Sequence, residues 1–122
     1  MKVSEITEII NKWMPISIAE DFDNVGLLIG CPDSIVKNIL VTLDTTSKVI
    51  DEAIDNNCNL IISYHPIIFN DLKKVTSDSG YVQKSVIKAV KNNISVYAIH
   101  TSLDNHAAVS YTHLTLPTTG VV

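Results

Sequence analysis

Two polar motifs follow short apolar runs in this chain, and they carry its most reactive side chains. His65 follows the run 60–63, whereas His100 follows the run 94–99 and precedes Asp104 by four residues. If both runs are strands of one parallel sheet, the three side chains leave it at the same edge, where open α/β sheets bind ligands. Imidazole and carboxylate groups bind divalent cations. The spacing therefore favours a metal site, and the alternative is a set of loop side chains that only form hydrogen bonds.

The neighbours of His65 affect how it could be used. Pro66 restricts the backbone of His65 to extended conformations, which helps to fix where the ring points. Tyr64 is interpreted as a packing residue whose hydroxyl could also hydrogen-bond a ligand. Ser63 shares a face of the strand with His65 and could act as a nucleophile beside it, but no nucleophile-elbow sequence surrounds it. Metal binding is therefore the better supported chemistry at this edge.

Two other segments could bring polar groups to the same region. Asp44 ends another expected strand, although residues 44–46 are more simply explained as a turn and the cap of the helix that follows. The segment 23–30 contains glycines, but not in G-x-G-x-x-G spacing, and no Walker sequence occurs. Neither a dinucleotide site nor a P-loop is therefore supported.

The segments between these motifs predict alternating strands and helices. Helical spacing predicts helices over 4–13, from 46 to about 56 and over 81–92, and apolar runs predict strands over 25–30, 38–43, 60–63 and 94–99. This order implies right-handed crossovers and a largely parallel sheet with flanking helices, which is an α/β fold. Nearly continuous apolar runs such as 60–63 are typical of strands buried on both faces.

The first helix has a clear apolar period. Ser4 is expected to cap it with its side chain. Ile6, Ile9, Ile10 and Trp13 recur at helical spacing and are predicted to form its buried face.

The composition bounds the class of protein. The 122 residues are enough for one ordinary domain, and 46% hydrophobic with 18% charged residues fits an α/β domain rather than a disordered chain. The net charge of −4 provides no basic field for nucleic acid or anionic lipid. The chain contains nine lysines and no arginine, which excludes bidentate recognition of phosphate or guanine by arginine. We therefore expect no direct nucleic acid binding.

The cysteines and the N-terminus bear on the cellular compartment. Cys31 and Cys58 are isolated and are interpreted as small buried hydrophobic residues, which favours a reducing compartment. The first residues open directly into an amphipathic pattern without the apolar core of a signal peptide, and no run approaches the length of a membrane span. A cytoplasmic protein without a membrane partner is expected.

The composition changes near the end of the chain. From 105 onward there is no charged residue, and the segment is rich in threonine without a helical period. It differs from the Lys-, Asp-, Asn- and Ile-rich sequence before it. We therefore divide the chain into an N-terminal α/β region at 1–105 and a tail at 106–122 that is non-native or unstructured. His106 and His113 lie in this tail and are given no role.

Four ordered motifs together resemble the NIF-three-like family, which is often labelled GTP cyclohydrolase I type 2-like. They are DNVGLLIG at 23–30, VTLD at 41–44, IISYHPIIF at 61–69 and YAIHTSLD at 97–104. The resemblance extends over about residues 1–105. It implies an α/β protein with a dinuclear metal centre that commonly assembles as a ring-shaped homohexamer.

The resemblance also implies roles for individual residues. His65 matches the second histidine of a ligand pair, and Asp104 matches the aspartate ligand of an H-x-x-x-D motif. His100 matches the histidine of that motif and is expected beside the metals, where it positions water or carries a proton in catalysis. Two divalent metal ions are thus expected in the full-length protein, held in part by His65 and Asp104.

The chain departs from the family pattern in two places. Tyr64 stands where many bacterial members have the first histidine, and a phenol is a poorer ligand than imidazole near neutral pH. The C-terminal H-x-x-x-E motif that supplies further ligands is missing, since the last glutamate is Glu52. We therefore expect the N-terminal part of a longer protein, which by itself binds metal weakly and is inactive.

Two functional hypotheses follow from these implications. In the first, the full-length homo-oligomer is a metal-dependent hydrolase, in which the metals activate a bridging water and bind a small phosphorylated or nucleotide substrate. In the second, the protein is a non-catalytic interaction module, such as a transcription-associated scaffold, with a structural or regulatory metal.

Overall fold

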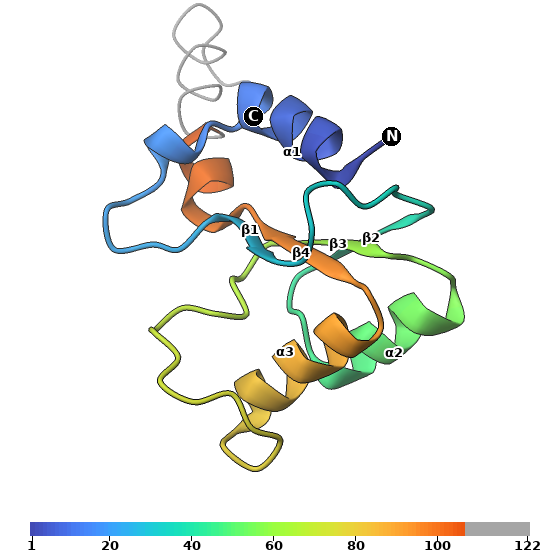
Figure 1. The fold of residues 1–122 in the computed structure, drawn as a ribbon. Coiled ribbons are helices and arrows are strands. Elements are labelled where there is room, and N and C mark those ends of the chain that lie inside the picture. The colour runs from blue at the N-terminus through green and yellow to red at the C-terminus, as the bar shows by residue number, and fades with distance from the viewer. Residues whose placement is uncertain (107–122) are drawn as a thin grey trace, which may run out of the picture.

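The computed structural model describes residues 1–106, which form an α/β fold built on a four-stranded sheet (Figure 1). The strands are β1 (Gly26–Ile29), β2 (Ile39–Thr42), β3 (Leu60–Ser63) and β4 (Ser95–Ala98). Their order across the sheet is β1-β4-β3-β2, with β2, β3 and β4 parallel and β1 antiparallel to β4. The predicted α/β class with a largely parallel sheet is confirmed.

The antiparallel strand β1 is held against β4 by a close backbone approach at its end. Gly30 follows β1 with a φ of +118°, and a Cβ atom at this position would lie 2.1 Å from the Ser95 side-chain oxygen. Only glycine adopts this conformation without a steric penalty and also leaves the necessary space. An antiparallel edge strand on an otherwise parallel sheet is common.

Helices cover both faces of the sheet. On one face α2 (Ser47–Asp55) and α3 (Tyr81–Lys91) pack side by side, and α1 (Val3–Trp13) lies on the other face, followed by the short 3-10 helix η1 (Ile16–Ile18) (Figure 1). Thr46 caps α2, because its Oγ1 accepts a hydrogen bond from the Val49 backbone N–H at 3.2 Å. Residues 100–106, directly beyond β4, are also helical.

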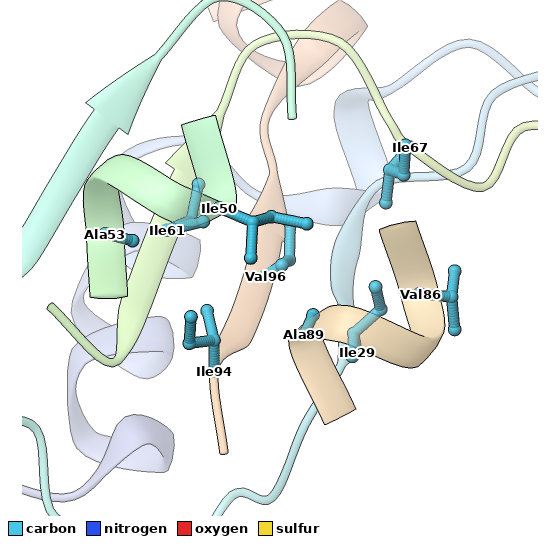
Figure 2. Close-up of a cluster of buried hydrophobic side chains, with 9 residues drawn as sticks. All are labelled: Ile29, Ile50, Ala53, Ile61, Ile67, Val86, Ala89, Ile94 and Val96. Carbon is cyan, nitrogen blue, oxygen red and sulfur yellow. The ribbon is translucent and has the colours of Figure 1, made fainter. Parts of the chain in front are cut away.

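The main hydrophobic core lies between the sheet and the pair of helices α2 and α3 (Figure 2). Ile61 of β3 and Val96 of β4 have no exposed surface, and they belong to one cluster with Ile50 and Ala53 of α2. Burying a large aliphatic side chain of this kind contributes about 1.5–3 kcal/mol. This packing anchors the two strands whose ends carry the polar motifs.

The N-terminus of α1 differs from the prediction. The helix begins at Val3, so Ser4 lies inside its first turn and does not cap it. The backbone N–H of Ser4 instead donates to the carbonyl oxygen of Pro32 at 2.9 Å, and the backbone N–H of Lys2 donates to Glu5 Oε1 at 2.8 Å. The prediction is wrong because a contact with the loop after β1, which is distant in sequence, satisfies this backbone group.

The buried face of α1 is also narrower than predicted. Val3 is fully buried, and Ile6 and Ile10 are half-buried, whereas Ile9 is 54% exposed and Trp13 is 74% exposed. Only one stripe of the helix faces β1, so apolar side chains beside that stripe remain on the surface. The predicted burial of Ile9 and Trp13 is therefore wrong.

Both cysteines are free, but only one contacts the core. Cys58 is half-buried and packs against the core cluster, whereas Cys31 is exposed in the turn after Gly30. The interpretation of Cys31 as a buried hydrophobic residue is therefore wrong. Within residues 1–106, no helix has the length and apolar character needed to cross a bilayer.

The predicted tail at 106–122 lies outside the described residues except for its first position. His106 is the last described residue and is helical. His113 lies among the residues that the structure does not describe.

Candidate metal centre

The carboxyl ends of β3 and β4 bring three rings together. Tyr64 and His65 directly follow β3, and a hydrogen bond of 2.9 Å from the His100 backbone N–H to the Tyr64 carbonyl continues the strand pairing. The ring centroids lie 4.8 Å apart for Tyr64 and His65, 5.2 Å for Tyr64 and His100, and 5.5 Å for His65 and His100. The predicted meeting of His65 and His100 at one sheet edge is confirmed.

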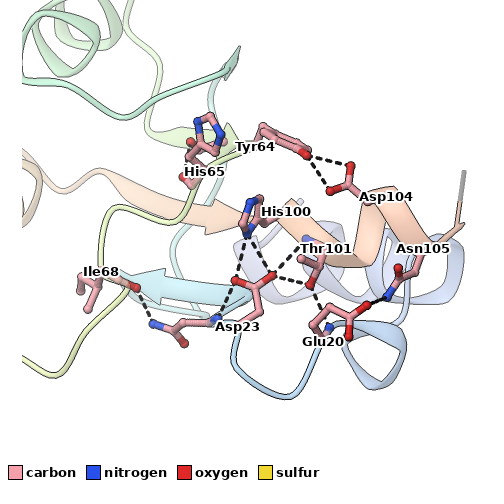
Figure 3. Close-up of polar contacts among 11 residues, drawn as sticks. Glu20, Asp23, Tyr64, His65, Ile68, His100, Thr101, Asp104 and Asn105 are labelled. Atoms are coloured by element: carbon pink, nitrogen blue, oxygen red, sulfur yellow. Dashed lines mark hydrogen bonds and ion pairs between the residues drawn. The ribbon is translucent and has the colours of Figure 1, made fainter.

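Asp104 joins this cluster through Tyr64. It lies in the helical segment 100–106, and its carboxylate oxygens accept the Tyr64 hydroxyl at 2.7 and 2.6 Å (Figure 3). This hydrogen bond, together with partial burial and the negative charges of Asp104 and Asp23, raises the pKa of the Tyr64 phenol above its usual 10.0. The phenol is therefore protonated at neutral pH and acts as a donor to Asp104.

His65 is paired with a carboxylate from the neighbouring strand connection. Its Nδ1 lies 2.8 Å from Asp44 Oδ1, and the side chains are 44% and 56% exposed, respectively. A carboxylate can only accept, so Nδ1 of a neutral His65 carries the proton and Nε2 carries the lone pair. Asp44 thus does more than shape a turn, since the cap of α2 is Thr46.

His100 is paired with a second carboxylate, which is buried. Its Nδ1 lies 3.0 Å from Oδ1 and 3.1 Å from Oδ2 of Asp23, whose side chain has no exposed surface (Figure 3). Asp23 also accepts hydrogen bonds from the Thr101 backbone N–H at 3.0 Å, the Thr101 hydroxyl at 2.5 Å and the Asn24 backbone N–H at 2.8 Å. This carboxylate is the most extensively bonded group near the cluster.

The ionisation of Asp23 reflects two opposing effects. Burial by itself raises the pKa of this carboxyl, because a buried charge loses hydration. The hydrogen bonds from Thr101, His100 and Asn24 favour the charged form and together outweigh burial, so the pKa of Asp23 lies below 3.8. Asp23 is thus ionised at neutral pH and accepts hydrogen bonds from Thr101, His100 and Asn24.

Sequence reasoning placed Asp44 at this edge without predicting its contact with His65, and it missed Asp23 as the partner of His100. Asp23 lies 77 positions from His100, and Asp44 lies 21 positions from His65. No motif spacing connects residues that far apart. The available signals were that Asp44 ends a strand at the same sheet edge and that Asp23 begins one of the four motifs.

Ser63 is not placed to act as a nucleophile. It is fully buried, and its hydroxyl donates to the carbonyl oxygen of His65 at 2.8 Å. The structure thus does not support the Ser63 nucleophile, which was the less favoured alternative at this edge.

The donor types at this edge fit a divalent cation, but their number does not complete a site. Imidazole nitrogen from His65 and a carboxylate from Asp104 are ordinary ligands of borderline cations, and Nε2 of His65 is the atom left with a lone pair. Residues 1–106 contain no group of three or more His, Cys, Asp and Glu side chains placed to hold a metal ion. Protein metal sites usually use at least three such ligands, so these residues supply part of one.

A pocket of about 240 Å³ adjoins the cluster. Its lining consists of Asp44, Thr45, Thr46, His65, Pro66, Ile67 and Tyr81. A small polar molecule in this pocket would lie next to the His65 side of the cluster.

Comparison with known proteins gives a consistent result. A model of the family Duf34/NIF3 (NGG1p interacting factor 3) matches residues 1–116. A Clostridium acetobutylicum protein named GTP cyclohydrolase 1 type 2 homolog is 49% identical over 105 residues, which are 86% of this chain and 39% of that protein. The chain thus spans well under half the length of this relative.

Solved structures agree with the sequence comparison. A hypothetical protein of Staphylococcus aureus matches with a TM-score of 0.82 and 39% identity, over 85% of this chain and 29% of that one. A Bacillus cereus protein related to NIF3 matches with a TM-score of 0.80 and 38% identity, over 85% of this chain and 28% of that one.

Proposed function

The chain belongs to the Duf34/NIF3 (NGG1p interacting factor 3) family, and on this basis we propose that its full-length protein binds divalent metal ions at the carboxyl edge of β3 and β4. His65 supplies Nε2 as one ligand, and Asp104 supplies its carboxylate as another. Further ligands come from outside residues 1–106, because the described part of the chain offers too few.

The observation that carries this proposal is the pairing of His65 with Asp44. A ligand histidine usually donates its other ring N–H to a carboxylate, which fixes the tautomer and orients the metal-binding nitrogen. The 2.8 Å contact between His65 Nδ1 and Asp44 Oδ1 has this arrangement. It leaves Nε2 as the ring nitrogen that can bind a metal, at the sheet edge where Asp104 also lies.

We further propose that the metal serves a hydrolytic reaction, which the name of the Clostridium acetobutylicum relative supports. A divalent cation supplies a nucleophile by lowering the pKa of bound water, and it neutralises charge that develops on the substrate. In that reaction His100 takes up a proton at Nε2, because its Nδ1 is engaged by Asp23. The substrate is a small phosphorylated compound or nucleotide, and the pocket beside His65 accepts part of it.

Metal titration of the 122-residue chain tests the ligand assignment. Calorimetry and visible absorption with Co²⁺ should detect weak binding, because only part of the site is present. His65→Ala and Asp104→Ala should each weaken Co²⁺ binding by more than about tenfold. Loss of a residue that only hydrogen-bonds a metal ligand already weakens metal binding by about tenfold or more, and loss of a ligand should cost more.

Asp55→Ala is the matched control for loss of a negative charge. Asp55 is the last residue of α2 and is exposed, away from the sheet edge. It should leave the affinity for Co²⁺ unchanged. Equal affinities in the wild type and in all three variants would show that the bound metal does not use His65 or Asp104.

A non-catalytic interaction module is the second candidate function. It is favoured by exposed apolar side chains on β2 and α1, including Val41 at 75% and Trp13 at 74% exposure, since such surfaces serve contacts between proteins. Turnover of a nucleotide or phosphoester panel by the metal-loaded full-length protein, lost on Asp104→Ala, would exclude it. Metal binding without any turnover would favour it.

A further inference from the structure

We infer that Asp23 is a positioning residue for His100, which holds the imidazole in the Nδ1–H tautomer and leaves Nε2 as its proton acceptor. The inference rests on the proposed function only for the reaction in which that acceptor is used. The tautomer itself is a property of the chain without any bound metal.

The Asp23 carboxylate accepts hydrogen bonds from several groups at once. It receives the Thr101 backbone N–H, the Thr101 hydroxyl and the Asn24 backbone N–H, in addition to His100 Nδ1 (Figure 3). An ionised carboxylate has about four acceptor sites and no donor. Each of these groups therefore donates, and Nδ1 of His100 must carry a proton.

The position of Asp23 is fixed by contacts that do not involve His100. The Thr101 hydroxyl that donates to Asp23 accepts the Glu20 backbone N–H at 2.9 Å. The side-chain amide of Asn105 donates to the carbonyl oxygen of Ile18 at 2.5 Å. These contacts hold the segment before β1 against the helical segment 100–106. The carboxylate is thus fixed by the fold and in turn orients the histidine ring.

The two histidines at the sheet edge differ in how far their carboxylate contacts are exposed to water. Asp44 forms its contact with His65 in a half-exposed position, where water competes for both groups. Asp23 is fully buried, and the His100 side chain is only 23% exposed. His100 therefore has the more restricted ring, and Asp23 also stabilises the imidazolium that forms when Nε2 accepts a proton.

An amide at position 23 should reverse this arrangement. In Asp23→Asn the amide oxygen takes the position of Oδ2, because it can accept both donors of Thr101 there. The NH₂ group then takes the position of Oδ1, which loses the hydrogen bond from the Asn24 backbone N–H and places a donor 3.0 Å from His100 Nδ1. Nδ1 should accept from this donor, which moves the ring proton to Nε2. The variant retains the shape of the side chain but loses the free lone pair at Nε2.

Nitrogen-15 NMR of the metal-free 122-residue chain tests the inference. Long-range ¹H–¹⁵N correlations at about pH 8 distinguish the two neutral tautomers from each other and from the imidazolium. His100→Gln assigns the signals. Wild-type His100 should be in the Nδ1–H form, and Asp23→Asn should convert it to the Nε2–H form. Thr101→Val, which removes a hydroxyl from the same network but no contact with Nδ1, should retain the Nδ1–H form.

Two results would overturn the inference. One is a wild-type His100 in the Nε2–H form, which decides the question even where Asp23→Asn does not fold. The other is a folded Asp23→Asn chain that retains the Nδ1–H form. In a catalytically active full-length protein, Asp23→Asn should lower kcat by about 100-fold or more, with KM and metal content unchanged. Absence of metal from that protein would contradict the proposed function but not the tautomer.

Discussion

At the scale of single residues, each ring at the sheet edge is bonded to a carboxylate from another part of the chain. The pairs are His65 with Asp44, His100 with Asp23, and Tyr64 with Asp104. In the first two pairs the carboxylate accepts from Nδ1 and leaves Nε2 available. In the third pair the phenol donates, so Tyr64 shares Asp104 with any metal that the carboxylate binds. Under the proposed assignment of Asp104 as a metal ligand, Tyr64 therefore competes with the metal for the Asp104 carboxylate.

The lowered pKa of Asp23 predicts how stability depends on pH. Its value in the folded chain lies below the 3.8 of the unfolded chain, so Asp23 contributes stability above pH 3.8 and loses that contribution as pH falls through its folded pKa. The difference in free energy of unfolding between wild type and Asp23→Asn should thus shrink as the pH falls through 3.8 towards the folded pKa of Asp23.

Urea denaturation of both proteins between about pH 5 and pH 3 measures this difference. The carboxyl groups that do not contact Asp23 are common to both chains, so their titration cancels in the comparison. A difference that stays constant over this range would contradict the lowered pKa of Asp23.

At the scale of elements, the cluster depends on the register of β3 and β4. Ser63 pairs with Ala98 at the ends of these strands, so the residues that follow emerge side by side. A shift of one residue would turn every side chain of a strand to the opposite face. The buried side chains of Ile61 and Val96 prevent such a shift, because they pack into the core on the face of α2 and α3.

Gly30, at the end of β1, leaves no space for a side chain. Gly30→Ala places a Cβ atom 2.1 Å from Ser95 Oγ and 2.7 Å from Ser95 Cα, at a φ of +118°. Backbone strain and overpacking together should lower the free energy of unfolding by about 3 kcal/mol or more. Chemical denaturation measures the loss.

Gly80→Ala is the matched control, because Gly80 also has a positive φ, at +152°. Its added Cβ would meet only the flexible side chain of Gln83, at 2.7 Å. The loss should be clearly smaller than at Gly30. Equal losses at both positions would indicate that contact with β4 is unimportant.

At the scale of the whole molecule, the described region has an open, apolar edge. β2 is the last strand of the sheet as described, and Ile39, Val41 and Leu43 are 42%, 75% and 60% exposed. An edge strand with apolar side chains and free backbone groups pairs readily with other chains.

The 122-residue chain should therefore self-associate as its concentration rises, and Val41→Lys should reduce this association. A lysine on an edge strand disfavours pairing with a second strand. Val90→Lys is the matched control, since Val90 is 59% exposed on α3 and not on the sheet edge. Sedimentation velocity measures both variants. A wild-type chain that is monomeric at all concentrations, or equal effects of the two lysines, would contradict this prediction.

Local patterns in the sequence predicted the succession of strands and helices along the chain and the position of the polar motifs after two of the strands. Apolar runs such as 60–63 and a cap such as Thr46 are local signals, since the residues concerned are adjacent or one turn apart. The meeting of His65 with His100 followed from the rule that parallel strands end at a common edge.

The partners of these residues, in contrast, depend on the packing of the folded chain. The choice of Asp23 as the partner of His100, and the exposure of Trp13, depend on how segments distant in sequence pack together. Periodicity indicates which face of a helix is apolar, but the width of the buried stripe depends on the surface that it meets. Likewise, a carboxylate acquires a role at the sheet edge only when the fold brings it within hydrogen-bonding distance of a ring.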